Sequence, residues 1–139
     1  MTSEFNVAVH ALVYLSHRGG TLSSEELAQN ICTNAARVRK VLSKLKKAGL
    51  VETKEGADGG YLFDRDDGEV TLRQIGEALD CCFVSANWHS GDTDLPCLVA
   101  SGMGKIMDDI YSELDECCKE RLEKVTIHSI GQKIFGKRP

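Results

Sequence analysis

Basic and apolar residues alternate with a helical period in residues 33–48, TNAARVRKVLSKLKKA. One apolar stripe recurs at intervals that match the turn of an α-helix, and the opposite face carries small and basic residues. The stripe consists of Val38, Val41, Leu42 and Leu45, and the opposite face of Ala36, Lys40, Ser43 and Lys47. The pattern predicts a helix over about 35–48 that packs on a core and turns basic residues to solvent.

The charge of the chain is concentrated around this helix. The protein has 139 residues and a formal net charge of -4. Residues 33–54 hold seven basic residues and one acid, so this segment carries +6 and the remainder of the chain -10. A basic surface of this kind suits a polyanion such as nucleic acid, although a solvated helix face accounts for the same charges.

Two further helices are expected before the basic helix. An apolar stretch over residues 5–15 has helical spacing and ends at a glycine pair. Residues 23–26, SSEE, give a capping box at the start of a short second helix. Thr33 or Asn34 then caps the basic helix, so three helices follow one another with short connections.

A β-hairpin is expected directly after the basic helix. A strand is predicted over residues 50–54, LVETK, and a tight turn over residues 56–60, GADGG. The return strand is expected to start at residues 61–63, YLF. Helix, short helix, basic helix and hairpin follow in the order of a winged helix-turn-helix. In that motif the third helix enters the major groove of DNA, and the hairpin, or wing, can contact an adjacent minor groove.

A second strong pattern is a long helix expected over about residues 98–122. Apolar residues recur there at steps of four and three, close to the heptad seam of a coiled coil. They are Val99, Met103, Ile106, Ile110, Leu114 and Cys117. A chain of this size has little surface to cover such a helix, so we expect these residues to form a homodimer interface. Packing within one subunit is the alternative.

Three regions follow from these patterns. Residues 1–80 form the winged helix-turn-helix and 81–97 an effector or sensor loop; 98–139 hold the dimerisation helix and a C-terminal helix that packs back on the first helix. The expected fold class is mainly α with a small two-stranded β-wing, a winged helix-turn-helix plus a long dimerisation helix. Trp88 either lines an effector pocket in the loop or anchors the loop by burial.

The order and spacing of several short motifs resemble those of a family of bacterial regulators, the Rrf-two family of IscR, NsrR and CymR type. The motifs are TNAARVRKVL at 33–42, KKAGLV at 46–51, Gly56 with GGY at 59–61, and VTLRQI at 70–75. The resemblance covers nearly the whole chain. It implies a homodimeric winged-helix transcription regulator that binds a palindromic operator in duplex DNA, and we expect it to act as a repressor.

We expect the DNA contacts to come from the basic helix, its N-terminus and the wing. Cationic side chains would bind phosphates, and Asn34, Arg37 and Lys40 would read base edges. The full set of expected DNA-binding residues is Thr33, Asn34, Arg37, Arg39, Lys40, Ser43, Lys44, Lys47, Lys54, Gly59 and Gly60. The effector is not indicated by any motif.

Two features depart from the family pattern. Many members carry an arginine just before the wing glycine, where this chain has Glu55, and Asp58 adds a second acid to the wing tip. Cluster-binding members carry three closely spaced cysteines before the long helix, whereas here Cys97 stands alone and Cys81 and Cys82 lie fifteen or more positions earlier. We therefore expect no iron–sulfur cluster, no other metal and no cofactor, unless these three thiols converge in the fold.

Two cysteines support a further hypothesis, a thiol redox switch. Cys32 immediately precedes the basic helix, where a helix N-terminus and nearby cations favour the thiolate. Cys97 opens the long helix. We hypothesise that Cys32 pairs with Cys97 of the partner subunit on oxidation. Burial as small apolar residues is the alternative for Cys81, Cys82, Cys117 and Cys118, and for Cys32 the alternative is a thiol that is no switch.

Other functional classes find little support in the sequence. It has no phosphate-binding glycine loop, nucleophile elbow or metal-ligand spacing, so we expect no enzyme. It also has no signal-peptide pattern and no apolar run near the roughly 20 residues of a membrane span, which predicts a bacterial cytoplasmic protein without membrane contacts. The alternative function is a winged-helix protein-interaction module that does not bind DNA, which the acidic wing tip favours.

Overall fold

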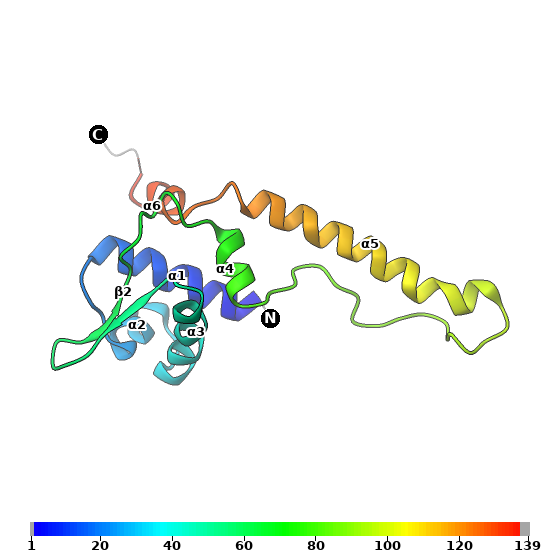
Figure 1. Ribbon diagram of the computed structural model, residues 1–139, viewed down its shortest axis with the longest axis horizontal. Helices are drawn as coiled ribbons and strands as arrows, with labels where there is room; N and C mark the ends of the chain where they lie inside the picture. Colours follow the sequence, from blue (N-terminus) through cyan, green and yellow to red (C-terminus); the bar gives the residue numbers. More distant parts are fainter. Residues whose placement is uncertain (1, 137–139) are drawn as a thin grey trace. The chain divides into compact units, whose positions relative to one another are not determined.

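The computed structural model describes residues 2–136, which form six α-helices and one two-stranded sheet (Figure 1). The elements are α1 (Thr2–Arg18), α2 (Ser24–Ile31), α3 (Ala35–Lys47), β1 (Glu52–Lys54), β2 (Gly60–Leu62), α4 (Leu72–Ala78), α5 (Leu98–Leu122) and α6 (Ile127–Phe135). The predicted fold class is confirmed. Two compact units are present: the chain up to Cys81 joined by the segment from Leu122 onward, and residues 82–121. None of the described helices is both long and apolar enough to cross a membrane.

The core of the first unit is built on α1. This helix contacts α2, α3, α4 and α6. Its Leu12 and Leu15 are completely or almost completely buried, together with Leu27 of α2 and the whole predicted apolar stripe of α3. Burying one such leucine stabilises the fold by roughly 1.5–3 kcal/mol. This packing fixes the rotation of α3 about its axis and thereby decides which of its residues face solvent.

Polar side chains start the helices. The Ser23 side chain accepts a hydrogen bond from the backbone N–H of Glu26 at 3.1 Å. Asn34 accepts one from the N–H of Arg37 at 2.8 Å, so Asn34 is the cap of α3. Thr71 heads a complete capping box at α4. Each such cap contributes about 1 kcal/mol and fixes the residue at which its helix begins.

The wing is a short hairpin anchored to the helical core. β1 and β2 pair antiparallel with Thr53 opposite Tyr61. Tyr61 and Leu22 exchange two backbone hydrogen bonds of 2.8 and 2.9 Å. A Cβ at Gly60 would lie 2.4 Å from the carbonyl oxygen of Leu22, so only glycine permits this approach. The segment before α2 therefore holds β2 in place.

The last helix completes the first unit. The backbone N–H of Ile127 donates to the carbonyl oxygen of Val70 at 3.1 Å, and that of His128 donates to Asp67 at 3.0 Å. Ile127 is almost fully buried. Because α6 also contacts α1, the C-terminal segment is part of the same core as the first helix.

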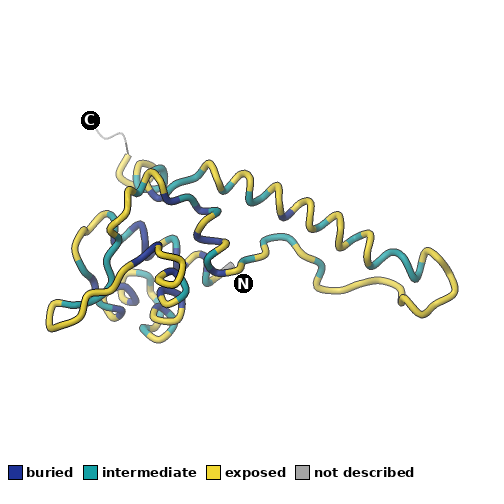
Figure 2. Tube along the Cα trace, in the orientation of Figure 1, coloured by how far each residue is buried: buried dark blue, intermediate teal, exposed yellow. Residues whose placement is uncertain are grey.

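The second unit consists of a loop and most of α5. Asp115 accepts hydrogen bonds from the backbone N–H groups of Phe83 at 2.6 Å and Val84 at 2.9 Å. Farther along the loop, His89 is hydrogen-bonded to Asp108 of α5 at 2.7 Å. Asp115 is the one buried residue of α5, and the other positions are exposed or intermediate (Figure 2). The helix therefore buries an acid and leaves its apolar residues uncovered.

Candidate nucleic-acid interface

The outer face of α3 carries the predicted polar and basic residues. Asn34, Arg39, Lys40, Ser43 and Lys47 are exposed, and Thr33, Arg37 and Lys44 are partly exposed. The apolar stripe on the other side is buried. The helix thus presents cations on the side that its core packing leaves free, as an approach to DNA requires.

Glu4 of α1 pairs with two of these lysines. Its carboxylate lies 3.1 Å from Nζ of Lys44 and 3.7 Å from Nζ of Lys40. The hydrogen bond from Lys44 is the main reason that the pKa of Glu4 falls below its ordinary value. The positive charge of Lys40 and Lys44 is therefore partly neutralised from within the protein.

Arg39 is held loosely at the neighbouring helix. It donates to Oγ of Ser24 at 3.1 Å and lies 4.0 Å from the carboxylate of Glu25. A hydrogen bond from Ser24 lowers the pKa of Glu25, with a smaller contribution from Arg39. Both Arg39 and Glu25 are largely exposed, and such surface pairs contribute little stability, so Arg39 stays available to another anion.

The side chains of Arg37, Lys47 and Lys54 have no hydrogen-bond or ion-pair partner within residues 2–136. Arg37 lies in the first turn of α3 and Lys47 at its end, and Lys54 ends β1. A cation without an internal partner gives up no ion pair when it binds a phosphate. These three residues are the strongest candidates for direct contact with a polyanion.

Thr33 and the wing glycines have structural roles. The N–H of Thr33 donates to the carbonyl oxygen of Ala28 at 3.0 Å in the turn between α2 and α3. A Cβ at Gly59 would lie 2.2 Å from the carbonyl oxygen of Lys54, so glycine is required to close the hairpin, as it is at Gly60. Both glycines shape the wing, and the DNA contacts predicted for them would come through their backbone.

Several supporting residues were not predicted from the sequence. Glu4 is one, and Thr21 is another, because its hydroxyl donates to the carbonyl oxygen of Asp58 at 2.8 Å and fixes the wing tip. Arg65 donates to the carbonyl oxygen of Gly49 at 3.2 Å, just beyond α3. No local pattern marks these residues, since each partner lies sixteen to forty positions away.

The predicted interface residues of α5 are open to solvent. Val99, Ile106, Ile110 and Leu114 are 42–68% exposed, Cys117 is exposed and Met103 is partly exposed. Leu98 and Trp88, near the start of the helix and in its loop, are also exposed. An exposed apolar stripe of this length is typical of a surface that contacts another apolar surface.

The cysteines do not form a metal-binding set. Within residues 2–136 no three His, Cys, Asp or Glu side chains are placed to hold a metal ion. Burial raises the pKa of the Cys81 thiol, which disfavours the thiolate that a metal needs. The Cys82 thiol donates to the carbonyl oxygen of Val84. The residues present thus do not fit an iron site built from Cys81, Cys82 and Cys97.

Comparison with known proteins agrees with this architecture. Residues 1–133 match the Rrf2 family, described as iron-dependent transcriptional regulators. Protein aau3 of Rhizobium meliloti is 31% identical over 105 residues, 74% of this chain and 68% of the relative. A protein of Neisseria meningitidis, named as a candidate HTH-type transcriptional regulator, is 30% identical over 140 residues, 94% of this chain and 86% of the relative.

Solved structures share the fold. A candidate transcriptional regulator from Lactobacillus plantarum has a TM-score of 0.83 at 24% identity, covering 99% of this chain and 93% of its own. CymR, the global cysteine regulator of B. subtilis, has a TM-score of 0.70 at 18% identity and 96% coverage of both chains. The resemblance seen in the sequence is confirmed: the chain belongs to the Rrf2 family of helix-turn-helix transcriptional regulators, and it is not an enzyme.

Proposed function

We propose that this chain is a homodimeric, sequence-specific repressor that places α3 in the major groove of a palindromic operator. The observation that carries the proposal is the outer face of α3, where the side chains of Arg37 and Lys47 have no partner among the described residues. A helix that packs with one face and exposes unpaired cations on the other is suited to the phosphates and base edges of a duplex.

The residues of this face divide into two roles. Arg37, Asn34 and Lys40 read base edges, since Asn34 caps α3 and the other two lie in its first half. The side-chain oxygen of Asn34 already accepts the Arg37 N–H, so its amide hydrogens are what it offers to a base acceptor. Lys47, Arg39 and Lys44 bind phosphates. Ser43 lies next to Lys44 on α3, and Thr33 lies just before the helix. Lys54 and the wing backbone reach the minor groove.

DNA binding is tested by fluorescence anisotropy on the full chain. The probe is the duplex upstream of its own gene, the control is a scrambled duplex of equal length, and each is titrated at several salt concentrations. We expect binding to the native duplex to be roughly 10³-fold tighter or more, with a steep loss of affinity as salt rises. Equal or absent binding to both, with a folded dimer, would instead support the protein-interaction module, which the acidic Glu55 and Asp58 at the wing tip favour.

We propose that the exposed stripe of α5 is the dimer interface. Two copies of the stripe, from Val99 to Cys117, would cover one another along a helix about 37 Å long. The partner that this surface needs is apolar and elongated, which a second α5 supplies. Light scattering should give a mass near twice the 15.2 kDa of one chain, and a mass of one chain at micromolar concentration would contradict the proposal.

We also propose that the regulator works without a metal or cluster and that its loop, residues 81–97, senses oxidation through Cys97. This thiol is exposed, and the backbone N–H groups of Ala100 and Val99 at the start of α5 lower its pKa. Cys32 is also exposed, but its sulfur lies 3.8 Å from the carbonyl oxygen of Gln29, at the end of α2 rather than at the start of α3. Cys97 is therefore the attacking thiol, and Cys32 of the partner subunit is its resolving thiol.

Diamide tests this pairing, because it accepts two electrons and two protons as the two thiols become a disulfide. We expect a peptide that joins Cys32 to Cys97 in a digest made without reductant, and a changed affinity for DNA. Unmodified thiols together with unchanged affinity would contradict the switch.

A further inference from the structure

A cavity of about 350 Å³ lies in the first unit, where α1, α6 and the segment before α4 meet. Its volume falls within the range of small-molecule sites, about 300–1,000 Å³. Two buried apolar side chains, Val13 and Ile127, lie at its base. We call this cavity the α1–α6 cavity.

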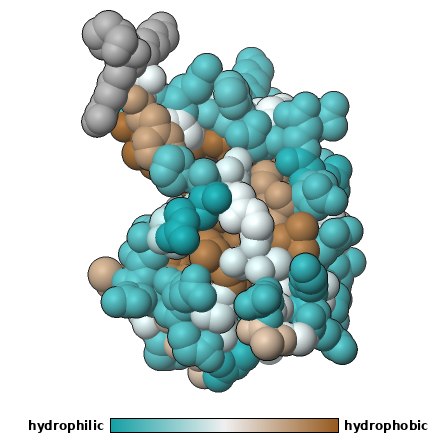
Figure 3. All heavy atoms as spheres, turned by 90° about the vertical axis from the view of Figure 1, so that its left-hand side faces the viewer, coloured by the Kyte–Doolittle hydropathy of each residue, from teal (hydrophilic) through white to brown (hydrophobic). Residues whose placement is uncertain are grey.

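One wall of the α1–α6 cavity is aromatic. The rings of His17 and Phe135 stack with centroids 4.0 Å apart and an angle of 19° between their planes. Phe135 is nevertheless 40% exposed, and hydrophobic surface gathers where α6 ends (Figure 3). A second, more apolar cavity of about 260 Å³ shares these two rings. A planar ligand can therefore reach the aromatic wall from solvent.

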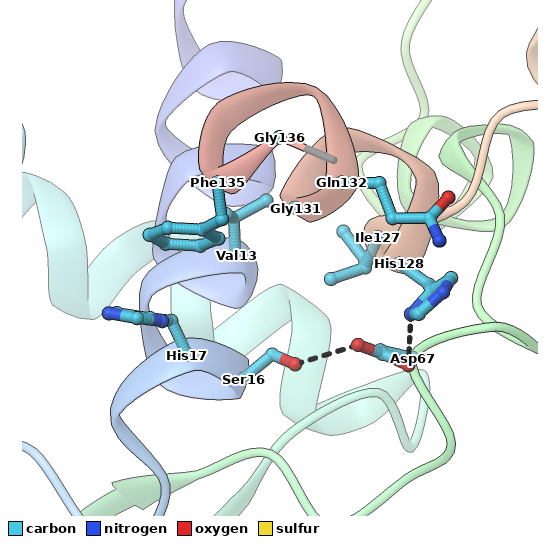
Figure 4. Close-up of a pocket in the computed structure, with 10 residues that line it drawn as sticks. All are labelled: Val13, Ser16, His17, Asp67, Ile127, His128, Gly131, Gln132, Phe135 and Gly136. Atoms are coloured by element: carbon cyan, nitrogen blue, oxygen red, sulfur yellow. Dashed lines mark hydrogen bonds and ion pairs between the residues drawn. The ribbon is translucent and has the colours of Figure 1, made fainter. Parts of the chain in front are cut away.

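The opposite wall is polar and centred on Asp67. The hydroxyl of Ser16 donates to Oδ2 of Asp67 at 3.1 Å, and Nδ1 of His128 lies 3.4 Å from Oδ1. Figure 4 shows the two side chains converging on this carboxylate, with His17 and Phe135 on the other side. A carboxylate has about four acceptor positions. Positions therefore remain on Asp67 for a donor brought by a ligand.

The charge of the lining indicates the class of ligand. Asp67 is its one carboxylate, and no lysine or arginine is among the described residues that line it. Gln132 adds a neutral amide, and Ser16 a hydroxyl. A ligand with donor hydrogens and a positive charge matches the carboxylate of Asp67. An anion would face this carboxylate, and within the described lining only His17 and His128 can become cationic, which requires their protonation.

Gly131 enlarges the cavity from the middle of α6. A Cβ built on it meets no atom within 4 Å, so packing does not require glycine there. Its backbone is not in the left-handed region either. Glycine inside a helix costs about 1 kcal/mol relative to alanine. Gly131 lines the cavity, and the space left by its missing side chain opens onto it.

We propose that the α1–α6 cavity binds a small planar organic cation. The ring of the ligand packs against His17 and Phe135, and its amine or amidinium group donates to Asp67 beside Ser16. The site is complete within the first unit and needs neither DNA nor a partner subunit. Control of transcription by such a ligand would rest on the proposed function, whereas the binding itself does not.

Benzamidine is a suitable probe, because it joins a planar ring to an amidinium group that can form two parallel hydrogen bonds with a carboxylate. Benzoate has the same shape and the opposite charge. We would titrate each into the ¹⁵N-labelled full chain, without DNA, and follow the backbone amide resonances. We expect saturable shifts at Asp67, His128 and Gln132 with benzamidine, at a Kd on the order of 1 mM for so small a ligand, and none with benzoate.

Two variants test the geometry, and one is a matched control. Asp67→Asn removes the charge-assisted hydrogen bond and should weaken benzamidine binding about 10-fold or more. Glu69→Gln is the control: Glu69 lies two positions after Asp67, carries the same charge and does not line the cavity. This substitution should leave benzamidine binding unchanged. Gly131→Leu should abolish binding by filling the cavity, and its thermal unfolding shows that the fold is kept.

The proposal is overturned if benzoate binds as well as benzamidine, if Asp67→Asn and Glu69→Gln behave alike, or if a folded Gly131→Leu variant binds normally. Absence of saturable shifts up to about 10 mM benzamidine, ten times the expected Kd, would also overturn it. Because the titration contains no DNA, failure of the DNA-binding proposal leaves each of these outcomes unaffected.

Discussion

The apolar stripe is buried in α3 and exposed in α5. α3 buries Val38, Val41, Leu42 and Leu45 and turns its cations outward. α5 exposes its apolar stripe and buries a single acid, Asp115. Both helices have a regular apolar pattern, so the pattern alone does not reveal what covers it. α3 finds its cover within the first unit, whereas the apolar stripe of α5 remains uncovered in one chain.

The contrast shows where each surface must find a partner. The outer face of α3 offers charge and needs a polyanion, and the stripe of α5 offers apolar area and needs a second apolar surface. Substitutions on α3 should therefore change stability or DNA binding, and substitutions on the exposed face of α5 should change assembly.

Leu42→Ala should have the largest effect on stability. The side chain is completely buried, so its truncation should cost about 2–5 kcal/mol in the free energy of unfolding. Ile106→Ala on α5 is the matched change at a residue that is 54% exposed. At protein concentrations too low for assembly it should change chemical unfolding by less than about 0.5 kcal/mol. An equal loss of unfolding free energy in the two variants would contradict the proposed difference between the buried stripe of α3 and the exposed stripe of α5.

Ile110→Glu places a charge in the middle of the exposed stripe. We expect the variant to keep the helical circular dichroism spectrum of a folded chain and to become monomeric in light scattering, because the buried charge in a dimer would have no partner. Glu113→Gln, at an exposed position outside the predicted stripe, is the control and should remain dimeric. A dimeric Ile110→Glu variant would show that α5 is covered in another way.

Arg37→Ala and Lys47→Ala separate base reading from phosphate binding on α3. Arg37→Ala should weaken operator binding by about 1–3 kcal/mol and relax specificity at one base position. Lys47→Ala should weaken binding to all duplexes alike and reduce the salt dependence by about one ion. Anisotropy titrations against operator and scrambled duplex distinguish the two, and Lys105→Ala on α5 should change neither.

Asp115→Ala tests the buried acid of α5 and should destabilise the loop by about 1–3 kcal/mol, because the N–H groups of Phe83 and Val84 lose their acceptor. Burial acts to raise the pKa of Asp115, but hydrogen bonds from Val84, Phe83 and Lys119 outweigh it and lower the pKa. The charged form is therefore favoured by folding, and this stabilisation is present above the unfolded pKa, near 3.8, and lost as the pH falls through the lower folded value.

Fluorescence of Trp88, the single tryptophan and a residue of the same loop, follows this transition. We expect an acid transition in the native protein and its absence in Asp115→Ala. A loop signal that stays constant from neutral pH to pH 2 would contradict the role of Asp115.

Glu4→Gln should have the smallest effect. It releases Lys40 and Lys44 from their shared carboxylate, so the outer face of α3 becomes more cationic. We expect DNA affinity to rise about two- to threefold at low salt for operator and scrambled duplex alike, an increase that salt removes. Unchanged affinity would mean that neither lysine lies near the DNA.

Local signals in the sequence were enough to predict most of the fold. The bounds predicted for α5, about residues 98–122, agree with the structure, because its apolar residues recur every three or four positions. The wing was predicted from its glycines. The sequence offered Thr33 and Asn34 as alternative caps for α3, and in the structure the cap is Asn34.

Contacts between distant residues were not predictable. The partners Glu4 and Lys44 are forty positions apart, and nothing near either one indicates the other. Asp115 follows Leu114 and looks like an ordinary surface acid until the loop folds over it. The α1–α6 cavity was missed for the same reason, since it joins residues 13–17, Asp67 and residues 127–136.

The return of α6 to α1 has a consequence for biosynthesis. The ribosome releases α1 more than a hundred residues before α6. Buried Ile127 and the backbone bonds to Val70 and Asp67 form only then. The first unit consequently completes its core only after α6 has been made, although most of this unit is synthesised before α5. Nascent chains stalled within α5 should hold an incomplete core and be cleaved readily by protease.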